Sequence, residues 1–100
     1  MKEYIELMKE LGFIDTTGNR QGNKIVKQFT KYNDNGLITD TINYFYTRKT
    51  GVTVFTNSVK HAGGCRLDHN LLFAVQSIFY ELQRELEKGN KRKWEPIKLF

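Results

Sequence analysis

The dipeptide Asn35-Gly36 constrains the fold most, because it interrupts a long stretch, residues 24–57, in which β-branched, aromatic and polar residues alternate. Asn-Gly is the preferred pair for a two-residue hairpin turn, since both turn positions need a positive φ. Such a turn places Lys31 opposite Asp40, Phe29 opposite Ile42, Lys27 opposite Tyr44 and Ile25 opposite Tyr46. An opposite-charge pair and an aromatic–β-branched pair then fall in register, which favours the assignment.

A second turn is predicted at residues 49–51, which have the sequence Lys-Thr-Gly. A three-residue hairpin loop takes glycine at its left-handed position, and Gly51 suits that position. Tyr46 then faces Val54, and Tyr44 faces Thr56. Residues 24–57 are therefore expected to form a three-stranded antiparallel meander.

This register sorts the sheet into two faces, because side chains alternate along a strand. The face expected to meet the core carries Ile25, Phe29, Ile38, Ile42, Tyr44, Tyr46, Val52 and Val54. The opposite face, here called the second face, carries mainly Thr, Asn and Gln, together with Lys24, Val26, Tyr32, Phe45 and Phe55.

Two helices are predicted on either side of the strands. Residues 2–11 place apolar side chains at three- and four-residue spacings, and Gly12 with Phe13 marks a glycine stop. Residues 68–88 form a wider apolar stripe, which Asp68 caps at its start and Gly89-Asn90 ends. Residues 15–23, rich in Thr, Asn and Gly, are expected to be a loop.

The predicted fold class is α+β in the order α-β-β-β-α, with both helices packed on one face of the meander. One hundred residues make one domain, which we place at residues 1–90. Residues 91–100 form a basic and apolar C-terminal tail that would pack in extended form on the sheet or on a partner. Its large apolar side chains are Trp94, Ile97, Leu99 and Phe100.

Composition indicates a basic, disulfide-free protein. The net charge is +5, and residues 16–66 carry the surplus, with eight basic residues against two acidic ones. Such a balance favours an acidic partner, either nucleic acid or an acidic protein surface. The single cysteine, the lack of an 18-residue apolar run and the charged N-terminus indicate a cytoplasmic protein without a membrane segment.

The segment "HAGGCRLDH", residues 61–69, contains both histidines and the only cysteine, so it allows four interpretations. The favoured one is structural: Gly63-Gly64 turns the chain and Asp68 caps the next helix. A metal site would use His61, Cys65 and His69, but the H-x3-C-x3-H spacing lacks a fourth ligand and a paired-cysteine motif. A Cys65–histidine nucleophile pair lacks an orienting group. An anion could instead contact the glycine amides and the neighbouring basic residues.

Candidate binding residues are basic side chains that gather at turns. They are Arg48 and Lys49 on one hairpin tip, Lys60, His61 and Arg66 before the second helix, and Lys91, Arg92 and Lys93 after it. Clustered lysine and arginine side chains on loops suit the phosphate backbone of nucleic acid.

The aromatic residues of the second face form another candidate surface. Tyr32, Phe45 and Phe55 are of the type on which nucleic-acid bases stack. The same patch could instead be covered by the C-terminal tail or by a second copy of the chain in a homodimer.

The helix–three strands–helix order, with "RLDHNLL" opening the second helix, is similar over residues 2–88 to that of double-stranded-RNA-binding domains. Those domains carry a lysine cluster where this chain has "RLDHNLL", so the resemblance is one of topology. The chain also looks like the compact proteins that bacteriophages and mobile elements encode to block host machinery.

The sequence therefore predicts a non-enzymatic basic binding protein without metal or cofactor. Its expected partner is nucleic acid or a nucleic-acid-handling complex. The alternative is an inhibitor of the anti-CRISPR or anti-restriction type, which would occupy the nucleic-acid or partner site of a host defence protein.

Overall fold

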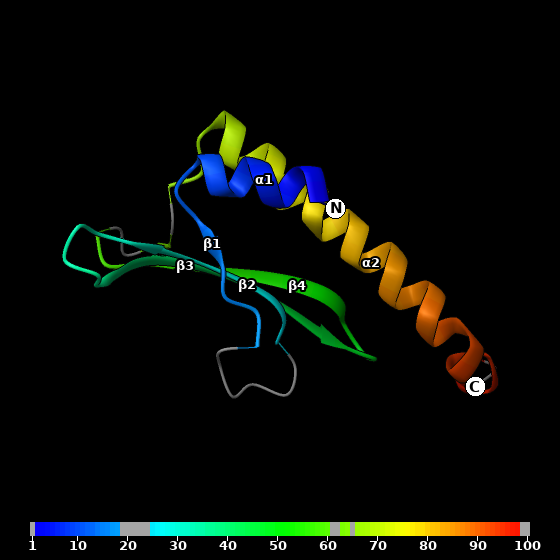
Figure 1. Cartoon of the computed structure of the whole chain (residues 1–100). Helices are drawn as coiled ribbons and strands as arrows, with labels where there is room; N and C mark the ends of the chain where they lie inside the picture. The colour runs from blue at the N-terminus through cyan, green and yellow to red at the C-terminus, as the bar shows by residue number, and fades with distance from the viewer. Residues whose placement is uncertain (1, 19–24, 61–62, 65, 99–100) are drawn as a thin grey trace.

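The computed structural model describes residues 2–18, 25–60, 63–64 and 66–98, and side chains up to Glu87. Its elements are α1 (Lys2–Glu10), β1 (Ile14–Asp15), β2 (Ile25–Tyr32), β3 (Ile38–Thr47), β4 (Gly51–Ser58) and α2 (His69–Lys98). The strands form one antiparallel sheet in the order β1-β2-β3-β4, and both helices lie on the same side of it (Figure 1).

The predicted α+β class with an antiparallel sheet is confirmed, but the predicted element order is wrong. A fourth strand, β1, lies between α1 and β2 and pairs with β2, so the meander has four strands. This strand has two residues, too few to show a period in the sequence.

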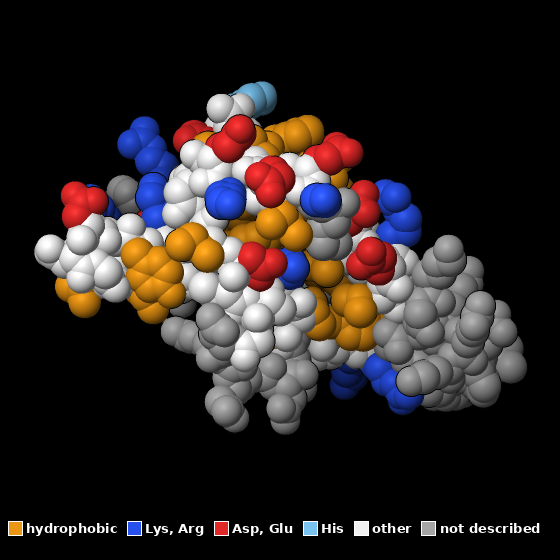
Figure 2. All heavy atoms as spheres, in the orientation of Figure 1, with side chains coloured by type: hydrophobic (Ala, Val, Ile, Leu, Met, Phe, Trp, Pro, Cys, Tyr) orange, Lys and Arg blue, Asp and Glu red, His pale blue; other side chains and the backbone are white. Residues whose placement is uncertain are grey.

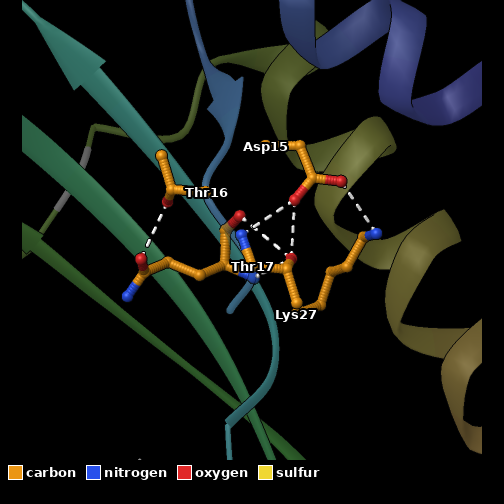
Figure 3. Close-up of polar contacts among 5 residues, drawn as sticks. Asp15, Thr16, Thr17 and Lys27 are labelled. Atoms are coloured by element: carbon orange, nitrogen blue, oxygen red, sulfur yellow. Dashed lines mark hydrogen bonds and ion pairs between the residues drawn. The ribbon is translucent and has the colours of Figure 1, made fainter. Parts of the chain in front are cut away.

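Side chains as well as backbone hold β1 against β2. Thr16 N donates to Gln28 O (2.9 Å), and Gln28 N donates to Thr17 Oγ1 (3.0 Å). A threonine hydroxyl thus replaces a carbonyl and continues the pairing past the end of the strand. Asp15 Oδ2 lies 2.8 Å from Lys27 Nζ on the helix side of the sheet, where Figure 3 shows the two side chains meeting.

The carboxyl group of Asp15 has a pKa below its ordinary value. Burial raises this pKa. Hydrogen bonds from Lys27 and Thr17 to the carboxylate, together with the charge of Lys27, lower it by a larger amount. The pKa of Asp15 is lower in the folded protein than in the unfolded chain. Its interactions therefore stabilise the fold at pH values above the unfolded pKa, and this stabilisation is lost as pH falls through the folded pKa.

Substituting Asp15→Asn should therefore lower the free energy of unfolding by roughly 1 kcal/mol at neutral pH. The difference between variant and parent should shrink as pH falls below about 3.8, the ordinary aspartate value. Urea titrations at pH 7 and pH 3 measure both differences, with Asp34→Asn in the exposed β2–β3 loop as the control for net charge. A deficit of the same size at both pH values would contradict the role given to this ion pair.

The β2–β3 register is confirmed from Lys27–Tyr44 to Lys31–Asp40 and differs at both ends. At the turn, Gly36 N donates to Asn33 O and Asn33 N donates to Leu37 O, which closes a three-residue loop, 34–36. Gly36 alone in this loop has a positive φ, +80°, so the predicted two-residue turn is wrong.

At the other end of β2, a β-bulge between Ile25 and Lys27 changes which residues face the core, so the predicted faces of Ile25 and Val26 are wrong. Ile25 pairs with Phe45 instead of Tyr46, and Val26 packs against the core. An extra residue in one strand changes which face its neighbours occupy. The irregularity near Tyr32 has a similar effect on Ile38, which pairs with Tyr32 and is exposed instead of buried.

The β3–β4 register is two residues away from the predicted one. Tyr46 pairs with Val52 and Tyr44 with Val54, so the predicted partners Val54 and Thr56 are wrong. Gly51 has the predicted positive φ. It pairs with Thr47 as the first residue of β4, however, and so lies outside the loop in which it was predicted. A shift of two residues returns each side chain to its original face, so the face assignment of β4 is unaffected.

The core lies between the sheet and the two helices. Its fully buried side chains are Met8, Phe29, Ile42, Tyr44, Ala74 and Ile78. Phe29 and Tyr44 meet edge to face with ring centroids 6.3 Å apart. The Tyr44 hydroxyl donates to Val75 O (2.9 Å), which ties β3 to α2, and burial raises the pKa of this phenol.

The helix boundaries confirm three of the four predicted ends. At the end of α1, Phe13 N donates to Met8 O and Gly12 N to Lys9 O, the bonding of a Schellman stop. Asp68 Oδ1 accepts from Leu71 N (2.9 Å), which confirms the N-cap of α2.

The predicted stop at Gly89-Asn90 is wrong, because the backbone of α2 continues as a helix to Lys98. One glycine costs about 1 kcal/mol in a helix interior, which the lysine, arginine and glutamate residues around it can offset. Residues 91–98 are thus helical instead of extended. Their side chains lie outside the described ones, so the docking of the tail stays a prediction. None of the described helices is long and apolar enough to cross a membrane.

Candidate nucleic-acid interface

A groove of about 350 Å³ lies at the end of the sheet where the β2–β3 turn, the end of β4 and the start of α2 meet. Its lining comes from six parts of the chain. The residues are Leu11, Phe13, Lys31, Tyr32, Asn33, Thr39, Asp40, Ser58, Lys60, Arg66, Asp68 and Leu71. We call Lys31, Lys60 and Arg66 the groove cations.

Lys31 enters the groove from β2 and lies against the end of α1. Its ammonium nitrogen is 5.9 Å from the centre of the Phe13 ring, within cation–π range. A side chain at Gly12 would begin 3.2 Å from Lys31 Cε, so this glycine leaves the space that Lys31 occupies. The Schellman stop of α1 thereby positions a cation contributed by a strand.

Lys60 and Arg66 flank the turn between β4 and α2. Gly64 is buried in this turn with a φ of +104°, and a side chain there would collide with Thr56 Oγ1 and the Thr56 carbonyl. Only glycine suits such a close approach at this backbone conformation. The structural interpretation of Gly64 is therefore confirmed, and the turn brings Lys60 and Arg66 to one groove.

The charges of the groove are mixed, with two carboxylates beside the three cations. Asp68 is engaged as the α2 cap, and Asp40 accepts from Thr39 Oγ1 (2.9 Å). Within the described part of the chain, Lys60 and Arg66 form no ion pair. Both are exposed. The groove thus presents exposed cations beside neutral hydrogen-bonding groups from Asn33, Thr39 and Ser58.

The groove gathers three of the residues predicted from the sequence, Tyr32, Lys60 and Arg66. Arg48 and Lys49 are exposed but lie at the opposite end of β3, in the β3–β4 turn. Lys91, Arg92 and Lys93 lie on the C-terminal part of α2, and their side chains are outside the described ones. His61 and Cys65 also lie outside the described residues. Among the described residues, no three His, Cys, Asp or Glu side chains gather to hold a metal ion.

The groove also contains a cation that sequence reasoning passed over. Lys31 was interpreted as the cross-strand partner of Asp40, and the two do pair in register. Its contact with Phe13 depends on the way α1 joins the sheet, which no local pattern encodes.

The second face carries a buried polar layer that the sequence also left unexplained. Thr16 Oγ1 donates to Gln28 Oε1 (2.8 Å) and lies 2.8 Å from Thr30 Oγ1. Gln28 Nε2 donates to Asn43 Oδ1 (2.7 Å). These side chains and that of Thr41 are less than a tenth exposed. Thr16 points to this side of the sheet, away from Asp15 and Lys27, in Figure 3.

The predicted aromatic patch is divided. Phe45 and Phe55 meet edge to face with centroids 5.5 Å apart, whereas Tyr32 lies at the other end of the second face, next to the groove. Phe55 is 61% exposed.

On the side of the molecule shown in Figure 2, basic and acidic side chains alternate over the helices instead of forming one basic patch. Comparison of the chain with protein-family models, curated proteins and solved structures gives no match.

Proposed function

We propose that this protein is a non-catalytic binding protein whose groove cations contact the phosphate backbone of nucleic acid. The observation that supports the proposal is the convergence of Lys31, Lys60 and Arg66 from three segments on one groove. Cations held by separate elements can contact successive phosphates, and such contacts provide affinity without sequence preference. Arg48, Lys49 and the basic residues of the C-terminal part of α2 would extend the contact electrostatically.

The groove suits phosphate better than an apolar ligand. Its neutral polar groups include the Asn33 amide and the Ser58 hydroxyl, which can donate hydrogen bonds to phosphate oxygens. The carboxylate of Asp68 is occupied by the backbone N–H of Leu71, which reduces its repulsion of an anion.

The test is the double substitution Lys60→Gln and Arg66→Gln, measured by fluorescence anisotropy with labelled oligonucleotides at about 0.1 M salt. Each lost phosphate contact should lower affinity about 5- to 10-fold, so the pair should lower it roughly 30- to 100-fold. The double variant Lys2→Gln and Arg84→Gln removes the same charge from exposed positions outside the groove, and it should retain affinity within about threefold. Equal losses in the two double variants would contradict the groove as the site.

A second candidate function is inhibition of a host protein by occupying its nucleic-acid or partner surface. Exposed apolar side chains on α2, Leu72, Phe73 and Tyr80, and the mixed charges of Figure 2 favour a protein partner. This function predicts a tight protein complex and no measurable affinity for free nucleic acid at low salt.

A further inference from the structure

Phe55 presents an open aromatic surface at a fixed place on the second face. It is 61% exposed, although a phenylalanine on a strand is usually covered. The edge-to-face contact with Phe45, at an interplanar angle of 76°, holds its ring. Its neighbour across the strands is Asn43, because these two residues pair in the β3–β4 register.

Asn43 is the last member of the hydrogen-bonded chain on the second face. Thr16 gives its hydroxyl hydrogen to Gln28, and Gln28 gives an amide hydrogen to Asn43 Oδ1. Asn43 is 7% exposed, yet its Nδ2 makes no hydrogen bond among the described residues. Reversing both amides would leave the oxygen without a partner instead, so Asn43 keeps one unused polar atom in either arrangement.

An unused polar atom beside an open aromatic ring matches the two kinds of contact that a nucleic-acid base makes. The flat face of a base stacks on an aromatic ring, and its edge forms hydrogen bonds with an amide. Among the described residues, the neighbours of Phe55 on the second face are uncharged; they are Asn43, Phe45, Thr53 and Asn57. Charged ligands are therefore disfavoured there, and a neutral planar group is favoured.

The basic groove lies further along the same strand. Lys60 follows Phe55 by five residues, beyond the end of β4 at Ser58, so the two lie at most about 16 Å apart along the chain. Lys31 and Asp40 place this groove on the helix side of the sheet, because each is two residues from a buried core residue, whereas Phe55 lies on the second face. A phosphate backbone held by the groove cations would therefore reach Phe55 by passing around the end of β4. Tyr32, 41% exposed and lining the groove, provides a second aromatic surface at that end.

We infer that the protein binds single-stranded nucleic acid, with an unpaired base stacked on Phe55 and contacted at its edge by Asn43. This inference rests on the proposed function and specifies its ligand. Duplex nucleic acid is excluded from this contact, because its bases are stacked on one another and their faces are not available.

The experiment compares Phe55→Ala with the parent protein on a labelled 12-nucleotide oligo(dT) and on a 12-base-pair duplex. The variant should bind oligo(dT) about 5- to 100-fold more weakly and bind the duplex as the parent does. Phe73→Ala removes an equally exposed phenylalanine, 56% exposed, from α2 and should leave both affinities unchanged. Asn43→Leu, which keeps the volume and removes the amide, should weaken oligo(dT) binding less than Phe55→Ala does.

The outcomes separate this inference from the proposed function. If Phe55→Ala binds oligo(dT) as the parent does while the groove double variant does not, the inference is wrong and the proposed function stands. If the parent binds neither probe at low salt, both are wrong. A concentration-dependent dimer that Phe55→Ala dissociates would also overturn the inference, because a second copy would then cover the stacking surface.

Discussion

Gly64→Ala is expected to lower the free energy of unfolding by roughly 2–5 kcal/mol, the combined cost of a strained φ and of overpacking. Gly64 has a φ of +104°, and the new methyl group would collide with Thr56 Oγ1 and approach the Thr56 carbonyl oxygen to 2.9 Å. The hydroxyl can rotate away, but the carbonyl belongs to β4 and cannot. The free energy of unfolding from urea titration is the measurement.

Gly63→Ala is the matched control, because a methyl group at Gly63 meets no atom within 4 Å. This substitution should change stability by less than about 0.5 kcal/mol. Equal destabilisation by the two substitutions would contradict the close approach of Gly64 to β4. Because the same turn positions Lys60 and Arg66, Gly64→Ala should also weaken nucleic-acid binding where the protein remains folded.

Phe29→Ala is the second substitution with a large expected effect, a loss of about 3–5 kcal/mol. Phe29 is fully buried between the sheet and the helices, and its ring meets that of Tyr44. Removing the ring leaves a cavity that the surrounding strands cannot close. The midpoint of urea unfolding should fall sharply, with a slope close to that of the parent.

Two further variants show whether burial explains that effect. Phe29→Leu keeps most of the volume and should cost less than half as much. Phe55→Ala makes the same chemical change at an exposed position of the sheet and should cost less than about 1 kcal/mol. A similar loss at Phe29 and Phe55 would contradict the assignment of the core to the helix-covered face.

Features that depend on local chemistry could be predicted from the sequence. The cap at Asp68, the stop at Gly12 and the central register of the first hairpin each require a few residues at fixed spacing, and all three are confirmed. The ends of that register could not be predicted, because Asn33 extends the turn beyond Asn35-Gly36 and a bulge at Val26 changes the faces.

Features that depend on tertiary contacts could not be predicted. β1 exists because Thr16 and Thr17 bond to Gln28, twelve and eleven residues away. The groove joins residues from Leu11 to Leu71, and Lys31 belongs to it only because α1 places Phe13 beneath its side chain. The sequence identified Lys60 and Arg66 as basic residues at a turn, but not the strand cation beside them.

The most direct test of the proposed function is the salt dependence of oligo(dT) binding, measured from about 50 to about 200 mM salt. The logarithm of the binding constant should fall linearly with the logarithm of salt concentration, with a slope of about −0.7 for each phosphate contacted. The double variant Lys60→Gln and Arg66→Gln should reduce the magnitude of that slope by about 1.4. A slope near zero, or the same slope in the parent and the double variant, would contradict phosphate binding in the groove.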